Sequence, residues 1–187
     1  MSWYAPHLEA SLRMIQEYAV NTTSSIIDIG GGASTLPRDL LEKGFNNITV
    51  LDISQSALDI LRQNLGDLGS QVKYICSDVT EEGVLPVHTF QVWHDRAVFH
   101  FLTEEHLRQA YVARILESVV PGGYIILAPF GPEGPTRCSG LDVERYSSDK
   151  LQQVLGERFE LVTSFLDYHS TPFGTTQQFN YCLFRLK

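Results

Sequence analysis

The sequence of 187 residues is poor in positive charge. It has 14 lysines and arginines against 22 aspartates and glutamates, so its formal net charge at pH 7 is −8. Broad binding to nucleic acids or to anionic membranes requires basic surface, and this acidic balance argues against both kinds of partner. No apolar run reaches the length of about 18 residues that a membrane-spanning helix needs.

The sequence also lacks the patterns of a secretory signal and of a structural metal site. Its first ten residues, MSWYAPHLEA, contain no basic segment followed by an apolar stretch, so we expect no secretory signal. The three cysteines, Cys76, Cys138 and Cys182, are far apart and form no CxxC pair. This spacing disfavours a metal site and indicates a reducing, cytoplasmic environment.

Hydrophobic residues make up 43% of the chain and charged residues 19%, which is typical of a globular protein. We expect one domain over residues 1–187, in which short apolar runs alternate with helical patterns. This alternation predicts a doubly wound α/β fold of three layers, with a parallel sheet covered on both sides. The predicted strands are residues 24–29, 47–53, 72–78, 90–95 and 123–130; the predicted helices are 35–43, 54–65, four turns entered by Thr103 and ended by Pro121-Gly122-Gly123, and 147–155.

The two ends of the chain depart from this alternation. Residues 159–170 and 177–186 read as two strands with no helix between them, so they predict an antiparallel hairpin. Residues 6–19 predict an extra helix before the first strand. With the loop over residues 131–146, this N-terminal segment is expected to cover the ligand site as a lid.

The segment IIDIGGGAST, residues 26–35, places three consecutive glycines at the end of the first predicted strand. Ligands of doubly wound sheets bind beyond the carboxyl ends of the strands, where glycine permits a tight turn and a close approach of the ligand. The fingerprint of dinucleotide-binding proteins, GxGxxG, does not fit, because Thr35 stands at its last glycine position. Asp28, two residues before the first glycine, is also unfavourable beside a pyrophosphate.

The segment is similar to the DxGxG motif of the class I S-adenosylmethionine-dependent methyltransferases. The resemblance implies a seven-stranded, mostly parallel sheet in the order 3-2-1-4-5-7-6 with the antiparallel hairpin at its end. It also implies that S-adenosylmethionine binds at the glycine loop, with Asp28 near its cationic end. The loop residues that we expect at the cofactor are Gly30, Gly31, Gly32 and Ser34, whose hydroxyl is a candidate for binding the cofactor carboxylate; Ser34 stands where the family often has a further glycine.

The resemblance continues at the ends of the next two strands. Asp52 ends the second strand, where its carboxylate can accept hydrogen bonds from both ribose hydroxyls, and Ile53 can pack on the adenine. Asp78, in CSDVT, resembles the adenine-binding acid of the family, and the amide of Val79 can bind a ring nitrogen. The motif alone is weak evidence, but these acids in this order make it specific.

The fourth strand ends in WHDRAVFHFL, the region that faces the transferred methyl group in this family. His94 and Asp95 are the candidates for a general base. Alternatively, His94 contributes only its backbone carbonyl to the cofactor, and Asp95 forms a structural ion pair with Arg96. The candidate substrate-side residues are Tyr4, Arg96, His100 and Cys138.

The function that we expect is methyl transfer from S-adenosylmethionine to a nucleophile, on a small molecule rather than on a protein side chain. Nucleic acid is not expected as the acceptor, on grounds of charge and because the fourth strand does not end in a [DN]PP[YF] pattern. Two alternatives from other classes remain at this point: an NAD-dependent oxidoreductase and a catalytically inactive scaffold that keeps the cofactor fold. The sequence sets no metal ion and no oligomeric state.

Overall fold

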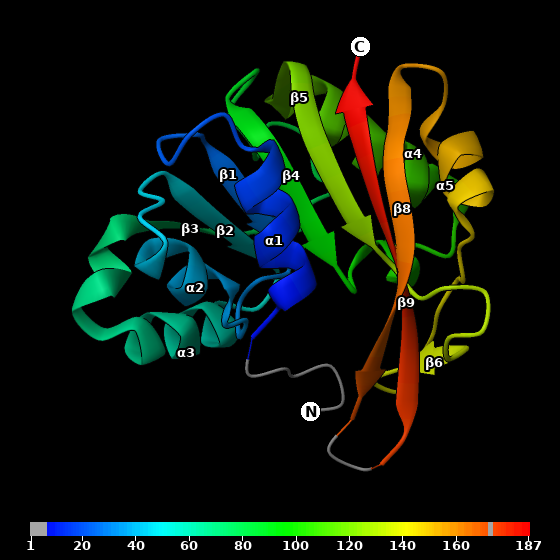
Figure 1. Ribbon diagram of the computed structural model, residues 1–187, viewed down its shortest axis with the longest axis horizontal. Helices are drawn as coiled ribbons and strands as arrows, with labels where there is room; N and C mark the ends of the chain where they lie inside the picture. Colours follow the sequence, from blue (N-terminus) through cyan, green and yellow to red (C-terminus); the bar gives the residue numbers. More distant parts are fainter. Residues whose placement is uncertain (1–6, 172–173) are drawn as a thin grey trace.

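The computed structural model describes residues 7–171 and 174–187, which form a twisted seven-stranded sheet with helices on both faces (Figure 1). Tyr4, a predicted substrate-side residue, lies outside the described residues. The strand order is β3-β2-β1-β4-β5-β9-β8, so the predicted α/β architecture and the predicted order of the seven strands are confirmed. The strands are β1 (Ile26–Ile29), β2 (Ile48–Asp52), β3 (Val72–Cys76), β4 (Phe90–Arg96), β5 (Val119–Ala128), β8 (Phe159–Ser170) and β9 (Thr176–Leu186).

The first five strands of the sheet pair in parallel, whereas β9 runs antiparallel to both β5 and β8. All the parallel strands therefore end at one edge of the sheet, where the glycine loop follows β1. The hairpin formed by β8 and β9 pairs along its whole length, from Phe159 opposite Leu186 to Ser170 opposite Thr176. Only the second half of β9 pairs with β5, so the turn end of the hairpin projects past the carboxyl edge (Figure 1).

Two apolar clusters fill the space between the sheet and the helices. The helices are α1 (Glu9–Tyr18), α2 (Leu36–Glu42), α3 (Gln55–Leu65), α4 (Glu105–Ser118) and α5 (Ser148–Leu155). Side chains of α1, α2 and α3 pack on one face of the sheet, and side chains of α4 and α5 pack on the other. Because successive side chains of a strand point to opposite faces, each central strand contributes to both clusters. None of the helices in the described part of the chain has the length and apolar character needed to cross a bilayer.

Two helices begin with a serine cap. Ser54 precedes α3, and its hydroxyl accepts a hydrogen bond from the Ala57 amide at 3.3 Å. Ser147 does the same for α5 through the Lys150 amide, at 3.2 Å. These bonds satisfy amides that have no partner within the helix. Gly66 ends α3 with φ 59°, a conformation that residues with a β-carbon rarely adopt.

The structure corrects three details of the sequence-based assignment. The prediction that Pro121-Gly122-Gly123 ends the fourth helix is wrong, because α4 ends at Ser118 and these residues lie within β5. Gly122 has φ 80°, close to a register shift between β4 and β5, so the turn residues mark a strand irregularity. The helix begins at Glu105 and Glu104 precedes it, where Thr103 was expected. The predicted loop over 131–146 contains a short hairpin of β6 (Arg137–Cys138) and β7 (Leu141–Asp142).

Candidate active site

Two cavities lie at the carboxyl edge of the sheet, on either side of the glycine loop. They share Ile29, Gly30 and Arg96. The small polar cavity, of about 40 Å³, is lined in addition by Leu8, Asp28, Gly31, Ala33, Ser34, Thr35 and His94. The large apolar cavity, of about 460 Å³, is lined in addition by Leu51, Asp52, Ile53, Ser77, Asp78, Val79, Ala97, Val98, Phe101, Leu102, Cys138, Ser139 and Leu141.

The three glycines are required by close packing of the protein against itself. A β-carbon on Gly30, whose φ is 68°, would lie 2.2 Å from Cγ2 of Val98. A β-carbon on Gly31 would lie 2.3 Å from the Asp28 carboxylate, and one on Gly32 would lie 2.6 Å from the Asp52 carboxylate. The bare backbone therefore lets both carboxylates approach the loop. Since Gly30 also lines both cavities, the same backbone is open to a ligand on its other side.

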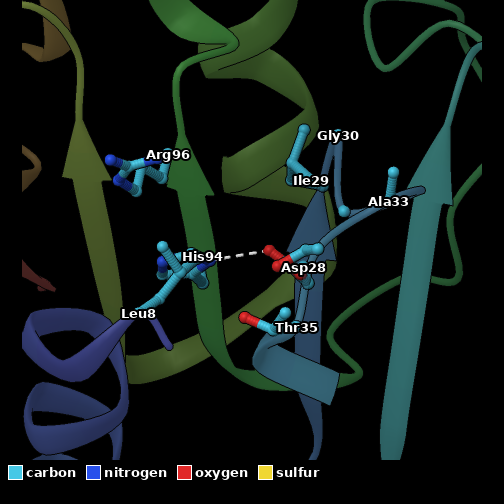
Figure 2. A pocket seen from close by; sticks show the side chains of 10 residues that line it. Leu8, Asp28, Ile29, Gly30, Ala33, Thr35, His94 and Arg96 are labelled. Atoms are coloured by element: carbon cyan, nitrogen blue, oxygen red, sulfur yellow. Dashed lines mark hydrogen bonds and ion pairs between the residues drawn. The ribbon is translucent and has the colours of Figure 1, made fainter. Parts of the chain in front are cut away.

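Asp28 has one oxygen bound within the protein and one without a partner. Its Oδ1 lies 2.7 Å from Nδ1 of His94, and both side chains are buried (Figure 2). Its Oδ2 is buried and has no hydrogen-bond partner among the described residues. An unpaired buried carboxylate oxygen is costly, and a cationic ligand group in the small polar cavity would relieve that cost. The ammonium of S-adenosylmethionine fits this requirement.

Other residues of the small polar cavity suit the carboxylate of an amino acid. Arg96 lies two residues after His94 on β4 (Figure 2), and it lines the small polar cavity together with Ser34 and Thr35. The Ser34 hydroxyl oxygen accepts a hydrogen bond from the Leu36 amide at 3.1 Å, which leaves its proton available. A guanidinium and a hydroxyl donor opposite a carboxylate are the chemistry that a zwitterion needs.

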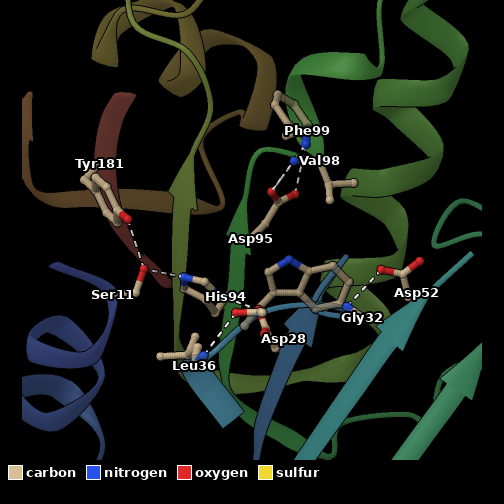
Figure 3. Close-up of polar contacts among 12 residues, drawn as sticks. Ser11, Asp28, Gly32, Leu36, Asp52, His94, Asp95, Val98, Phe99 and Tyr181 are labelled. Carbon is tan, nitrogen blue, oxygen red and sulfur yellow. Dashed lines mark hydrogen bonds and ion pairs between the residues drawn. The ribbon is translucent and has the colours of Figure 1, made fainter. Parts of the chain in front are cut away.

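Asp52 is held by two backbone amides. Its Oδ2 accepts a hydrogen bond from the Gly32 amide at 2.9 Å, and its Oδ1 accepts one from the Ser54 amide at 2.8 Å (Figure 3). Each carboxylate oxygen has a further lone pair, so both can still accept a hydrogen bond from a ribose hydroxyl. The side chain lines the large apolar cavity, and these amides keep it there.

The remaining predicted adenosine residues line the same large cavity. Asp78 accepts hydrogen bonds at one oxygen from the Thr80 amide and hydroxyl, at 2.8 and 2.7 Å. Ile53 is 72% exposed and Val79 is buried, and both face the cavity. An exposed isoleucine beside an apolar cavity offers a flat surface for a base. The arrangement can hold an adenosine between Ile53 and the loop after β4.

The residues at the end of β4 divide between the two faces of the sheet. His94 and Arg96 line the small polar cavity. Asp95 lies between them in sequence, and its carboxylate accepts hydrogen bonds from the Val98 amide at 2.9 Å and from the Phe99 amide at 3.1 Å (Figure 3). It also accepts one from the Tyr111 hydroxyl at 2.5 Å. Asp95 is fully buried and lines neither cavity. Because neighbouring residues of a strand point to opposite faces of the sheet, Asp95 lies on the face opposite His94, where the structure gives a candidate base no contact with either cavity.

The other substrate-side candidates occupy different surroundings. His100 lines neither cavity; its ring stacks on Phe130, and burial together with the charge of Arg96 lowers its pKa to about 3. A histidine in this state stays neutral and belongs to the core. Cys138 does line the large apolar cavity, from the β6–β7 hairpin, and burial raises the pKa of its thiol. It is therefore a neutral wall of the cavity at neutral pH.

Several residues that line the cavities were not predicted from the sequence. Leu8, Phe101, Leu102 and Leu141 are apolar residues outside the strands of the main sheet, so no periodicity distinguishes them from ordinary packing residues. Ser77, directly before Asp78, could have been inferred from its place at the end of β3. No group of three or more potential metal ligands comes together within residues 7–171 and 174–187.

The two cavities, at the ends of β1, β2 and β3, have the charges and the shape to suit a cofactor that joins a zwitterionic amino acid to an adenosine. A family model described as "Methyltransferase domain" matches residues 26–123. Among curated proteins, the chain is 23% identical over 161 residues to zebrafish EEF1A lysine methyltransferase 2 (81% of this chain, 61% of that protein). It is 27% identical over 106 residues to human N-terminal Xaa-Pro-Lys N-methyltransferase 1 (56% and 47%). The chain thus spans about half to three fifths of the length of these relatives.

Solved structures share the fold over nearly the whole chain. A methyltransferase from Methanosarcina mazei superposes with a TM-score of 0.76 at 15% identity, covering 92% of this chain and 96% of the other. The 1,6-didemethyltoxoflavin-N1-methyltransferase of Burkholderia thailandensis, solved with that compound and S-adenosylhomocysteine, gives 0.68 at 18% identity, covering 100% and 92%. Fold and site define a class I methyltransferase that uses S-adenosylmethionine. The chain belongs to the methyltransferase domain family, which argues against the oxidoreductase alternative.

The first prediction concerns the glycine loop. Gly30→Val should lower the affinity for S-adenosylhomocysteine at least tenfold, because a β-branched side chain resists φ 68° and displaces Val98 from the cavity wall. Titration calorimetry measures the affinity, and circular dichroism checks the fold. Gly66→Val is the matched control, since Gly66 also has positive φ but a β-carbon added to it would meet nothing within 4 Å. An unchanged affinity in Gly30→Val would place the cofactor elsewhere.

The second prediction concerns Asp95. Burial raises its pKa to about 6, although the hydrogen bonds from Tyr111, Val98 and Phe99 lower it. The folded protein then holds a proton that the unfolded chain loses near pH 4, so this contribution to stability is complete below pH 4 and is lost as the pH rises through 6. The free energy of unfolding of the wild type, relative to Asp95→Asn, should fall by roughly 2–3 kcal/mol over this range.

Urea unfolding of both proteins between pH 4 and pH 7.5 measures this difference. Asp59→Asn, which neutralises an exposed carboxylate on α3, serves as the control for the change of amino acid. A difference between wild type and Asp95→Asn that does not vary with pH would show that the buried carboxyl keeps an ordinary pKa.

Proposed function

We propose that the protein transfers the methyl group of S-adenosylmethionine to a small-molecule acceptor that is nucleophilic without a general base from the chain. One observation carries this proposal: neither candidate base is available. Both ring nitrogens of His94 are hydrogen-bonded inside the protein, to Asp28 at 2.7 Å and to Ser11 at 2.8 Å. Asp95 points to the opposite face of the sheet and is fully buried.

The cofactor supplies an electrophilic methyl group on a sulfonium and leaves as a neutral thioether. The residues of the chain then have to bind and orient, and orientation alone is worth up to about 7–11 kcal/mol of the barrier. Asp52 is proposed to hold the ribose, and Asp78 the adenine. Asp28 is proposed to hold the ammonium, with Ser34 and Arg96 at the carboxylate. Fixing both ends of the cofactor in this way fixes the direction of the methyl group between them.

The size and cover of the site support a small acceptor. The large apolar cavity, of about 460 Å³, has to hold the adenosine as well as any acceptor, and its volume lies within the range of roughly 300–1,000 Å³ found for small-molecule sites. Phe101 and Leu102 wall it on one side, and the β6–β7 hairpin supplies Cys138 and Leu141. The Burkholderia methyltransferase of similar fold was solved with a compact heterocycle as its acceptor.

A protein acceptor is the second candidate, and the curated relatives favour it. They are a lysine methyltransferase of EEF1A and methyltransferases of the N-terminal Xaa-Pro-Lys sequence. The net charge of −8 would also attract a basic peptide. A small amine and a lysine or N-terminal amine share the same acceptor chemistry, so the two candidates differ in what surrounds the nitrogen.

A screen that reads out S-adenosylhomocysteine tests the acceptor class. The panel contains small amines, heterocyclic nitrogens, thiols, phenols and carboxylates, together with lysine peptides and Xaa-Pro-Lys peptides. We expect turnover with a member of the small-molecule set. Turnover with peptides alone would replace the small-molecule proposal by the protein one.

The third prediction addresses the missing base. His94→Ala should weaken cofactor binding, but at saturating cofactor its single-turnover rate should fall less than tenfold, because the ring takes no proton from the acceptor. Loss of a true general base costs about 10²–10⁴-fold. Rapid-quench measurement of a single turnover separates the rate from the affinity. A rate loss of a hundredfold or more, at unchanged affinity, would identify His94 as the base.

A further inference from the structure

Four buried side chains from four elements form a continuous line of hydrogen bonds that ends in the small polar cavity. The Tyr181 hydroxyl on β9 lies 3.0 Å from the Ser11 hydroxyl on α1, and the Ser11 hydroxyl lies 2.8 Å from Nε2 of His94 on β4. Nδ1 of His94 lies 2.7 Å from Oδ1 of Asp28 on β1. Figure 3 shows the line, and each member is at most 2% exposed.

The donors in this line all point the same way. Burial raises the pKa of Tyr181, so its hydroxyl keeps its proton. At the other end of the line the Asp28 carboxylate can only accept, so it accepts the proton on Nδ1 of His94. In a neutral imidazole the other nitrogen, Nε2, is an acceptor, so the Ser11 proton goes to Nε2 and the Tyr181 proton goes to Ser11. Nε2 must then be unprotonated, and Nδ1 carries the proton that is donated to Asp28.

This order of donors determines which oxygen of Asp28 is left for a ligand. Oδ1 is occupied by the His94 proton, and Oδ2 has no partner among the described residues. The Asp28 carboxylate cannot rotate without breaking the hydrogen bond between its Oδ1 and Nδ1 of His94. The unsatisfied oxygen is thereby fixed, and it belongs to a residue that lines the small polar cavity.

We propose that Ser11 and Tyr181 are positioning residues for the cofactor, which act through His94 to hold Asp28 with one oxygen presented to the ammonium of S-adenosylmethionine. The proposal rests on the cofactor placement of the proposed function and extends it to residues that line neither cavity. It makes α1 part of cofactor recognition, since Ser11 is the member that connects this helix to the sheet.

The position of Ser11 supports this role. It lies on the face of α1 that carries the core residues Met14 and Ile15, and it is itself fully buried. A buried hydroxyl stabilises the fold only when its hydrogen bonds are made. Both of its hydrogen-bond partners belong to the line that leads to Asp28, whereas an alanine at this position would pack in the core without any such requirement.

Two ligands separate positioning from general stability. S-adenosylhomocysteine carries the ammonium, and 5′-methylthioadenosine has the adenosine and the thioether but no amino-acid portion. Calorimetric titration of Ser11→Ala should show about a tenfold loss of affinity for S-adenosylhomocysteine and, for 5′-methylthioadenosine, a change below twofold. Tyr181→Phe should show a smaller loss in the same pattern, because it removes the donor to Ser11 but leaves the Ser11–His94 bond possible.

The matched control is Ser118→Ala. Ser118 is a buried serine at the end of α4, and its hydroxyl donates to the Arg114 carbonyl, away from both cavities. This variant should bind both ligands as the wild type does. In the wild type, nitrogen-15 NMR of the imidazole rings should show His94 as the neutral form protonated at Nδ1.

The proposal is overturned if Ser11→Ala leaves the affinity for S-adenosylhomocysteine unchanged, or if it weakens the two ligands equally. A His94 ring protonated only at Nε2 would also overturn it. Failure of the cofactor placement gives a different result: the wild type would then bind 5′-methylthioadenosine and S-adenosylhomocysteine with the same affinity, or bind neither.

Discussion

Close packing of the glycine loop against its neighbours fixes the carboxyl edge of this sheet. The loop of Gly30, Gly31 and Gly32 lies so close to its neighbours that a side-chain carbon at any of the three would meet another side chain within 2.6 Å. The loop after β1 thereby contacts the Asp52 carboxylate on β2 and Val98 in the loop after β4. A ligand that crosses three strands needs their ends fixed relative to one another, and this packing fixes them before the ligand arrives.

The alternation of side chains along β4 gives neighbouring residues separate tasks. His94 and Arg96 face the small polar cavity, whereas Asp95 binds the amides of Val98 and Phe99 from the opposite face. Asp95 thus shapes the turn that walls the large cavity without touching a ligand. The strand therefore lines the small polar cavity on one face and supports the wall of the large cavity from the other.

The sequence predicts the fold well, because the fold depends on local patterns. Strand and helix periodicities, serine caps and an acid after each of two strands are all readable without a structure, and the strand order follows from the family resemblance. The burial of Asp95 on the face opposite His94 could not be predicted, because three polar residues in a row look alike until their faces are known. The partners of His94 also could not be predicted, since Ser11 lies 83 residues away and carries no motif. The β6–β7 hairpin was missed because strands of two residues have no periodicity.

The projecting end of the β8–β9 hairpin and the β6–β7 hairpin share one property: neither contributes to the parallel pairing of β1 to β4 that carries the cofactor residues. If these hairpins contact the acceptor, their residues can change while the residues at the ends of the parallel strands β1 to β4 stay constant. Evolution can then exchange acceptors with little effect on the reaction. Relatives of this fold and family are indeed named for a lysine of EEF1A, for a peptide N-terminus and for a toxoflavin precursor. In such a fold the residues of the reaction stay the same, and only the residues that contact the acceptor change.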